Sequence, residues 1–216
     1  MTYQAVLFDL DGTLLNTLED LADSMNAAVA RLGFPTHPLE AYNYFVGDGI
    51  VNMARRALPE DRRDDATTAR CVDLMRQIYT EHWRDKTVPY PGIPDLLDAL
   101  AARSLRMAIL SNKPHDFTVL CVEKLLPSWS FDTVQGVSEA VPPKPDPTGA
   151  QAVAARLGLS PEAFLYLGDT NTDMQTANAS GMFAVGACWG FRPPEELRAN
   201  GAQALIETPA QLLDLL

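Results

Sequence analysis

The chain has 216 residues, of which 47% are hydrophobic, and a formal net charge of -11 at pH 7. This length suffices for one full hydrophobic core, or for a core and a smaller second lobe. The acidic excess argues against nonspecific binding to nucleic acid or to an anionic membrane, since neither polyanion is attracted to a negatively charged surface. An acidic protein that acts on an anionic substrate therefore needs local cations at its site.

The first residues and the cysteines bear on the compartment. Residues 1–4 carry no basic region, and the apolar run that follows is too short for a signal core or a membrane span. The three cysteines, Cys71, Cys121 and Cys188, are widely spaced and form no Cys-x-x-Cys pair, so neither a disulfide framework nor a zinc site is indicated. We expect a cytoplasmic protein with reduced thiols.

The first apolar run of the chain ends in two carboxylates. Ala5–Phe8 is typical of a strand buried on both faces in a parallel sheet. Asp9 and Asp11 follow it, and Gly12 marks the end of the strand because glycine accepts backbone angles that other residues avoid. At the carboxyl edge of such a sheet, two acids suit a cation site or an acid/base pair. An Asp-Gly hairpin is the alternative, but the pattern after Thr17 is helical and begins like a capping box.

The next segment changes character and predicts a helical insertion. Between residues 16 and 88 apolar residues recur at helical spacing, and no run like the first strand appears. The Pro- and Gly-containing stretch 88–92 then breaks the helical pattern. We predict a small α-helical cap domain, residues 16–88, inserted into a core domain of residues 1–15 and 89–216. Its expected helices cover residues 17–32, 50–58 and 64–83.

After residue 92 the expected strands and helices alternate. This alternation indicates parallel βαβ units with right-handed crossovers. The predicted fold class is therefore α/β, with a Rossmann-like parallel sheet core that carries helices on both faces and the inserted cap. The expected strands cover residues 105–110, 131–137, 164–167, 183–187 and 204–206, and the expected helices cover residues 93–103, 117–126, 148–157, 173–180 and 210–216.

Three further strand ends carry polar residues. Ser111 and Asn112 follow one strand, Lys144 lies in a proline-rich loop that restricts its direction, and Asp169 and Asp173 flank the start of a helix. Each alone also fits a simpler role, which is helix capping for the serine, asparagine and aspartates and a plain loop for the lysine. Because they follow successive strands of one predicted sheet, we expect a common site.

In this order the motifs resemble those of the haloacid dehalogenase superfamily. The sequence Phe-Asp-Leu-Asp-Gly-Thr-Leu from Phe8 resembles the first motif, Ser111 the second, Lys-Pro-x-Pro at Lys144 the third and Gly-Asp-x-x-x-Asp from Gly168 the fourth. The superfamily's dehalogenases lack the second acid, which is present here as Asp11. The resemblance therefore implies phosphoryl transfer.

The resemblance also implies a role for each motif residue. Asp9 would attack phosphorus and form an aspartyl-phosphate, while Asp11 would protonate the leaving alcohol and then activate water. Mg²⁺ would be bound by the carboxylates of Asp9 and Asp169 and by the backbone carbonyl of Asp11, with Asp173 contacting a metal-bound water or Lys144. The phosphoryl oxygens would be bound by Gly12, Thr13, Ser111, Asn112 and Lys144.

A loop in the insertion bears on the substrate. The residues Gly47, Asp48 and Gly49, continuing to Arg56, resemble the cap segment of phosphoglycolate-phosphatase-like members. Arg55 or Arg56 could bind a substrate carboxylate bidentately, although a plain interhelical turn with solvated arginines stays open. We expect the insertion to close over the site, exclude water and read the leaving group.

These expectations lead to a Mg²⁺-dependent phosphomonoesterase, monomeric or homodimeric, that acts on a small metabolite such as 2-phosphoglycolate and binds neither nucleic acid nor membrane. A sugar-phosphate phosphatase, a mutase and a pyrophosphatase stay open because the superfamily shares its core chemistry. A noncatalytic phosphate- or partner-binding protein on the same fold predicts a lost nucleophile or lysine. Asp9, Asp11, Lys144 and Asp169 are all present.

Overall fold

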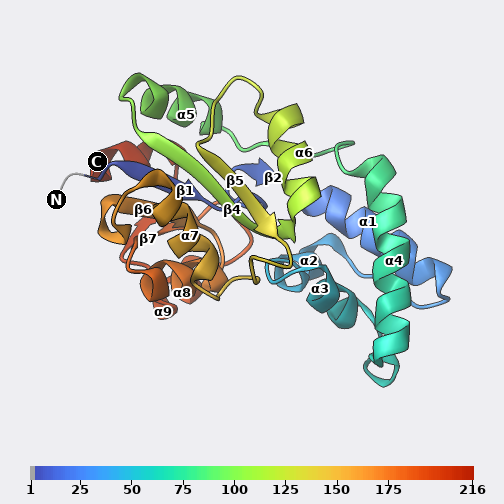
Figure 1. Cartoon of the computed structure of the whole chain (residues 1–216). Helices are drawn as coiled ribbons and strands as arrows, with labels where there is room; N and C mark the ends of the chain where they lie inside the picture. The colour runs from blue at the N-terminus through green and yellow to red at the C-terminus, as the bar shows by residue number, and fades with distance from the viewer. Residues whose placement is uncertain (1–2) are drawn as a thin grey trace. The chain divides into compact units, whose positions relative to one another are not determined.

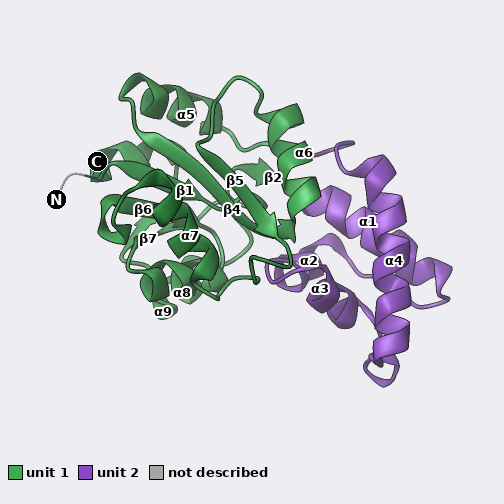
Figure 2. Cartoon of the chain, viewed as in Figure 1, with its two compact units in different colours: residues 1–15, 89–216 green, residues 16–88 purple. Residues whose placement is uncertain are grey.

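The chain forms two compact units, which the computed structural model describes over residues 3–216 (Figure 2). Unit 1 comprises Met1–Leu15 and Pro89–Leu216, and unit 2 comprises Asn16–Val88. The chain passes between them at β2 (Leu15–Asn16) and β3 (Val88–Pro89), two short strands that pair with each other. No helix within residues 3–216 is long and apolar enough to cross a membrane.

Unit 1 contains a six-stranded sheet in the order β5-β4-β1-β6-β7-β8, and every pair in it is parallel. The chain reaches β4 and β5 on one side of β1 and then β6, β7 and β8 on the other. The strand order therefore reverses at β1, which is where open α/β sheets form their ligand crevice. The strands are β1 (Ala5–Phe8), β4 (Arg106–Pro114), β5 (Thr133–Val137), β6 (Phe164–Gly168), β7 (Phe183–Ala187) and β8 (Ala204–Ile206).

The central strand β1 is buried along its whole length, as its apolar sequence requires. Its last residue, Phe8, pairs with Ile109 of β4 and with Leu167 of β6. The next amide, of Asp9, continues the ladder by donating to the Leu167 carbonyl at 2.9 Å. The polar residues that follow β1 and β6 are thereby brought next to those in the last part of β4.

Helices cover both faces of this sheet (Figure 1). Right-handed crossovers from β1 to β4 and β5 place α5 (Ile93–Ala102) and α6 (His115–Leu125) on one face. Crossovers in the opposite direction place α7 (Thr148–Leu157), α8 (Asn171–Ser180) and α9 (Pro194–Ala199) on the other. The α/β fold class predicted from the sequence is confirmed, with 3-10 turns η2 (Pro161–Ala163) and η3 (Pro209–Leu215) added.

Unit 2 is helical, and its longest helices α1 and α4 pack against each other. Met25 on α1 and Cys71 on α4 are buried, with their sulfur atoms 3.6 Å apart. Tyr42 on α2 is also fully buried and donates a hydrogen bond to Asn26 at 2.8 Å. The helices are α1 (Leu18–Arg31), α2 (Leu39–Phe45), α3 (Ile50–Ala57), η1 (Glu60–Arg62) and α4 (Asp65–His82).

Three local predictions were wrong. Residues 39–45 were assigned to no helix but form α2, a short helix whose only buried residue is Tyr42 and whose apolar periodicity is therefore weak. β4 continues to Pro114 rather than ending at residue 110, with a shift of register before its last residue. The last residues form the 3-10 helix η3 instead of an α-helix.

The capping box predicted at Thr17 is also absent. Thr17 precedes α1, but its buried hydroxyl makes no hydrogen bond within the described chain. Asp20, the expected partner, instead accepts hydrogen bonds from the backbone amides of Lys86 and Thr87 at 2.9 to 3.1 Å and from the Thr87 hydroxyl at 2.7 Å. Asp20 therefore binds residues 86 and 87, which are distant in sequence, instead of capping the start of α1.

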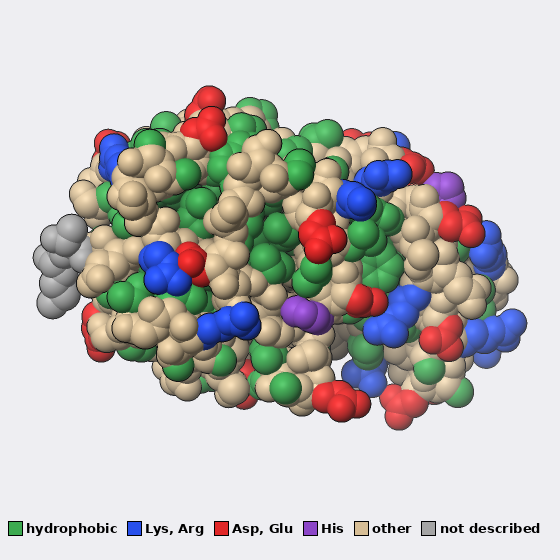
Figure 3. Space-filling view, turned by 45° about the horizontal axis from the view of Figure 1, so that its top comes forward, with side chains coloured by type: hydrophobic (Ala, Val, Ile, Leu, Met, Phe, Trp, Pro, Cys, Tyr) green, Lys and Arg blue, Asp and Glu red, His purple; other side chains and the backbone are tan. Residues whose placement is uncertain are grey.

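Charged side chains of both signs lie on the surface. The face drawn in Figure 3 shows acidic side chains at separate places with lysines and arginines among them. Other charged side chains are buried in unit 1, at the edge of the sheet.

Candidate active site

Lys144 lies between two carboxylates at the carboxyl edge of the sheet. Its Nζ is 2.7 Å from Asp9 Oδ1 and 2.7 Å from Asp173 Oδ1, and it also donates to the Leu110 carbonyl at 3.2 Å. These three acceptors match the three donors of an ammonium group. The side chain of Lys144 is 2% exposed, so its charge is shielded from water and fixed in direction.

The backbone of Lys144 is positioned by Asn112. The Asn112 side-chain oxygen accepts from the Lys144 amide at 2.7 Å, and its side-chain nitrogen donates to the Lys144 carbonyl at 3.2 Å. Asn112 therefore joins the tail of β4 to the proline-rich loop. The sequence did not predict this use of Asn112, and direct binding of phosphate by it stays a prediction.

Asp169 follows β6 and is fully buried. Its Oδ1 accepts from the Thr13 hydroxyl at 2.9 Å, and its Oδ2 accepts from the Phe191 amide at 2.8 Å. A Cβ atom on Gly12 or on Gly190 would overlap this carboxylate, so both positions need glycine for close approach. The sheet edge and the segment after β7 thus enclose Asp169 from two sides.

The segment after β7 was missed by the sequence analysis. Trp189 donates its indole N–H to the Thr13 carbonyl at 3.0 Å, next to the contact that Phe191 makes with Asp169. Both contacts use groups that carry no charge, and one uses the backbone, so a search for charged motifs does not detect them. The position of this segment, directly after another strand of the same sheet, was the feature of the sequence that could have pointed to it.

Asp173 lies in the first turn of α8. Its Oδ2 accepts from the Thr170 amide at 3.0 Å and from the Thr170 hydroxyl at 2.6 Å, while its Oδ1 accepts from the Tyr166 hydroxyl at 3.3 Å as well as from Lys144. The start of α8 therefore fixes Asp173, and both of its oxygens have donors.

The buried carboxylates outnumber the buried cation between them. Burial raises the pKa of Asp9 well above its usual value and Asp173 adds to this, while Lys144 opposes it. Burial and the nearby Asp173 raise the pKa of Asp169 to about 7. Burial alone would lower the pKa of Lys144, but Asp173 and Asp9 raise it well above the usual value. Ionisation of all these carboxyl groups would therefore leave an excess of buried negative charge.

This donor set fits a hard divalent cation. Asp9, Asp169 and Asp173 each offer a carboxylate oxygen, and these oxygens lie within 4.8 Å of one another in a fully buried group. Oxygen donors are the ligands that Mg²⁺ prefers, and a bound cation would offset the burial and the mutual repulsion that raise the pKa of Asp9 and of Asp169. The predicted ligands Asp9 and Asp169 belong to this group.

Asp11 is paired with a lysine that the sequence analysis did not single out. Lys113 Nζ lies 2.9 Å and 3.0 Å from the two carboxylate oxygens of Asp11. The Lys113 side chain is 4% exposed and that of Asp11 is 17% exposed. The two aspartates after β1 thus contact different lysines, Asp9 contacting Lys144 and Asp11 contacting Lys113. The position of Lys113 directly after Ser111 and Asn112 was the signal in the sequence.

The other predicted phosphate ligands have hydrogen bonds of their own. The Gly12 amide donates to the Leu15 carbonyl at 2.8 Å, and the Thr13 hydroxyl donates to Asp169. The Ser111 hydroxyl accepts from the Lys113 amide at 3.2 Å, which leaves its own proton as a donor. Direct contact of Gly12, Thr13 and Ser111 with phosphate stays a prediction.

The predicted specificity residues lie in unit 2 and contact one another. Arg56 pairs bidentately with Asp48 at 2.5 Å and donates to the Phe45 carbonyl at 3.1 Å. Gly47 and Gly49, on either side of Asp48, have φ values of 115° and 94°, which favour glycine. The arginine therefore anchors the loop, while Arg55 pairs with Asp65 at 3.1 Å.

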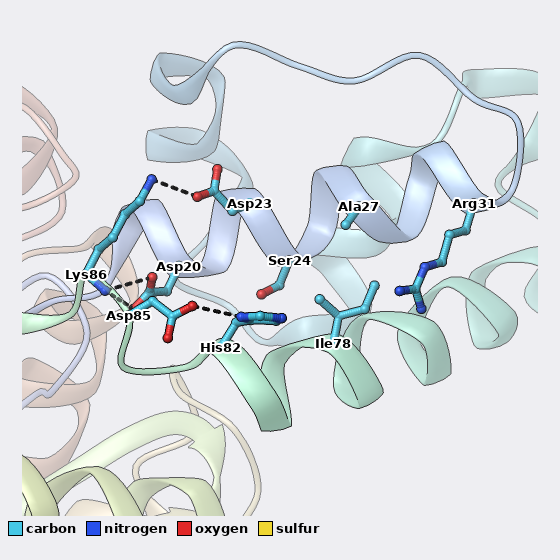
Figure 4. Close-up of a pocket in the computed structure, with 9 residues that line it drawn as sticks. All are labelled: Asp20, Asp23, Ser24, Ala27, Arg31, Ile78, His82, Asp85 and Lys86. Carbon is cyan, nitrogen blue, oxygen red and sulfur yellow. Dashed lines mark hydrogen bonds and ion pairs between the residues drawn. The ribbon is translucent and has the colours of Figure 1, made fainter.

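Unit 2 also has a pocket of about 300 Å³ between α1 and α4 (Figure 4). Its charged groups are paired with one another, because Lys86 contacts Asp23 at 2.8 Å and His82 contacts Asp85 at 2.7 Å. Ala27 and Ile78 lie between these pairs and Arg31. The pocket contains none of the residues of the buried site in unit 1.

Comparisons with known proteins find related sequences and structures. A model of haloacid dehalogenase-like hydrolases matches residues 6–187. Phosphoglycolate phosphatase of Pseudomonas putida is 32% identical over 96% of this chain and 78% of its own, and that of Chromobacterium violaceum is 32% identical over 99% and 96%. A provisionally named phosphoglycolate phosphatase from Lactobacillus delbrueckii subsp. bulgaricus has a crystal structure with a TM-score of 0.93, at 30% identity, covering 100% of this chain and 98% of its own.

Proposed function

The chain belongs to the haloacid dehalogenase-like hydrolases and is a phosphatase, and from this premise we propose that it hydrolyses 2-phosphoglycolate to glycolate and phosphate with Mg²⁺. The observation that carries the proposed chemistry is the pair of aspartates after β1, each held by its own buried lysine. A carboxylate suited to attack and a second one suited to proton transfer lie two residues apart at the edge where ligands bind.

In the first proposed step, a carboxylate oxygen of Asp9 attacks phosphorus. The bond between phosphorus and the ester oxygen breaks, and the protonated carboxyl group of Asp11 gives its proton to the leaving alkoxide. Lys144 orients the Asp9 carboxylate through the contact of 2.7 Å and offsets negative charge at the phosphoryl group. The products of this step are the alcohol and an aspartyl-phosphate at Asp9.

In the second proposed step, Asp11 removes a proton from water, and the resulting hydroxide oxygen attacks the same phosphorus. The bond between phosphorus and the Asp9 oxygen breaks, which releases phosphate and restores the Asp9 carboxylate and the protonated Asp11. Splitting the hydrolysis into two displacements lets one acid/base group serve both steps.

The proposed Mg²⁺ would be bound by the carboxylates of Asp9 and Asp169 and the backbone carbonyl of Asp11. When bound it supplies a positive charge that neutralises phosphoryl oxygens and the excess of buried carboxylates. The contacts of Asp169 with Thr13 and Phe191 keep this ligand in place. Asp173 supports the site through Lys144.

The choice of 2-phosphoglycolate is supported by the relatives that match nearly the whole chain. We further propose that unit 2, residues 16–88, acts as the cap of the enzyme and that the loop Gly47–Gly49 contributes to specificity. Arg56 would act by anchoring the loop through Asp48, and Arg55 offers the more exposed guanidinium of the two. A carboxylate at the far end of the substrate suits such a cation.

The experiment that tests this function measures kcat/KM for phosphate release with Mg²⁺ across a substrate panel. The panel contains 2-phosphoglycolate, several sugar phosphates, nucleoside monophosphates and pyrophosphate, and Asp9→Asn serves as the inactive control. A clear preference for 2-phosphoglycolate supports the proposed substrate. A preference for a sugar phosphate or pyrophosphate contradicts 2-phosphoglycolate as the substrate but is consistent with the proposed attack by Asp9. Equal activity of wild type and Asp9→Asn overturns the proposed nucleophile.

A further inference from the structure

Lys113 is a buried cation whose contacts point to a role of its own. A lysine ammonium is costly to bury unless it is paired, and this side chain is 4% exposed. Its Nζ contacts both oxygens of Asp11, at 2.9 Å and 3.0 Å. A carboxylate with both oxygens in contact with one ammonium is restricted in rotation. The pair therefore restricts where the Asp11 carboxylate can lie.

The backbone that carries Lys113 is fixed by its surroundings. The Lys113 amide donates to the Ser111 hydroxyl at 3.2 Å, and its carbonyl accepts from the Thr118 hydroxyl at 3.2 Å. A Cβ atom on Gly136 of the neighbouring strand would lie 2.6 Å from the same carbonyl, which shows how closely β5 packs here. Lys113 thus extends from a rigid strand to the residue that follows the adjacent strand β1.

The two buried lysines of the site contact different aspartates. Lys144 contacts Asp9 and Asp173, and its three donors are all used. Lys113 contacts Asp11, which the proposed function uses for proton transfer. Proton transfer depends steeply on placement of the acid relative to the leaving oxygen. A residue that fixes Asp11 therefore affects the step in which that proton moves.

We propose that Lys113 is the positioning residue of the acid/base group, fixing the Asp11 carboxylate by contact with both oxygens so that it meets the leaving oxygen of the ester. The proposal rests on the proposed phosphatase chemistry. Lys113 acts through Asp11, whose carboxylate carries the proton. Its removal is expected to matter most where the leaving group needs a proton, and least where the leaving group departs as a stable anion.

The test compares Lys113→Met with wild type on an alkyl phosphate monoester and on p-nitrophenyl phosphate. The p-nitrophenolate group leaves without protonation, whereas an alkoxide does not. We expect the loss in kcat to be at least about tenfold larger for the alkyl ester than for the aryl ester, with little change in KM. Lys113→Arg, which keeps a cation, should restore part of the difference. Lys124→Met, at an exposed lysine on α6, is the matched control.

A double-mutant cycle with Asp11→Asn provides the second readout. If Lys113 acts through Asp11, adding Lys113→Met to Asp11→Asn causes no further loss, because the positioned group is already absent. This comparison stays informative if the single variant folds poorly, because the double variant removes both charges. Equal losses on both esters, or additive losses in the cycle, overturn the proposal. A wild type inactive on both esters overturns the proposed phosphatase chemistry instead.

Discussion

Lys144 in unit 1 and Arg56 in unit 2 each contact an aspartate, but in opposite surroundings. Lys144 is 2% exposed and touches two acids and a carbonyl, whereas Arg56 is 39% exposed and its partner Asp48 is 24% exposed. Breaking a buried pair leaves an uncompensated charge, while a half-exposed pair is screened by water. Loss of Lys144 is therefore expected to affect both the proposed chemistry and the stability of the fold. The contact between Arg56 and Asp48, on which the proposed specificity depends, can be removed with little loss of stability.

The largest effect is expected from Asp9→Asn, which tests whether chemistry can be separated from stability within the buried site. An amide is not a nucleophile here, so turnover should fall to background. The fold should keep its stability, because Lys144 still contacts Asp173 and the neutral amide escapes the burial and the repulsion that raise the pKa of Asp9. Phosphate release and thermal unfolding, measured on the same preparation, check both parts. Substantial residual turnover would contradict the nucleophile.

Lys144→Met should lose both activity and stability, which sharpens the contrast with Arg56. Removing the lysine leaves Asp9 and Asp173 without their shared cation. Breaking a buried pair in this way costs about 3 to 5 kcal/mol in the free energy of unfolding. Urea denaturation measures the change, with Lys124→Met as the control for loss of an exposed lysine. A variant as stable as the control would show that the buried contacts contribute little.

Removal of divalent metal should make stability depend on pH in an unusual direction. The pKa of Asp169 is raised to about 7 by burial and by Asp173, whereas in the unfolded chain it is near its usual value of 3.8. The folded state then binds more protons than the unfolded state between these values, so stability falls as pH rises through about 7. Between pH 6 and pH 8 this amounts to about 1 kcal/mol.

Thermal unfolding in chelator at pH 6 and pH 8 measures this dependence. Saturating Mg²⁺ should weaken or reverse it, because a bound cation favours the ionised carboxylates. Asp169→Asn is the matched variant and should reduce the dependence in chelator by the part that Asp169 contributes, while Asp9, whose pKa is also raised, keeps its own part. Stability that rises between pH 6 and pH 8 without metal would contradict the raised pKa of Asp169.

Features that follow from local sequence patterns could be predicted, and contacts between distant side chains could not. The alternation of strands and helices and the acids after β1 and β6 were readable because buried strands have a distinct apolar pattern and their ends converge in any parallel sheet. The contact between Lys113 and Asp11 was not readable, because it joins residues 102 positions apart through side-chain directions that no local pattern encodes. The use of Asp20 by residues 86 and 87 was missed for the same reason.

The smallest effect is expected from Arg56→Met, which tests the half-exposed side of the comparison. Loss of the pair with Asp48 should change the free energy of unfolding by less than about 1 kcal/mol, because water screens it. If the loop Gly47–Gly49 contributes to specificity, KM for 2-phosphoglycolate should rise several-fold as the loop loses its anchor. The rate on p-nitrophenyl phosphate, which lacks the carboxylate, should stay near that of wild type.

Two variants separate the anchoring role of Arg56 from its charge. Asp48→Asn keeps the arginine but weakens the bidentate contact, so anchoring predicts the same rise in KM as Arg56→Met. A direct contact between Arg56 and the substrate carboxylate predicts instead that Asp48→Asn lowers KM, because it frees the guanidinium. Arg62→Met, which removes an exposed arginine of the same unit paired with Asp61, controls for charge alone. Equal effects of Arg62→Met and Arg56→Met would show that the charge of the unit matters and the anchor of the loop does not.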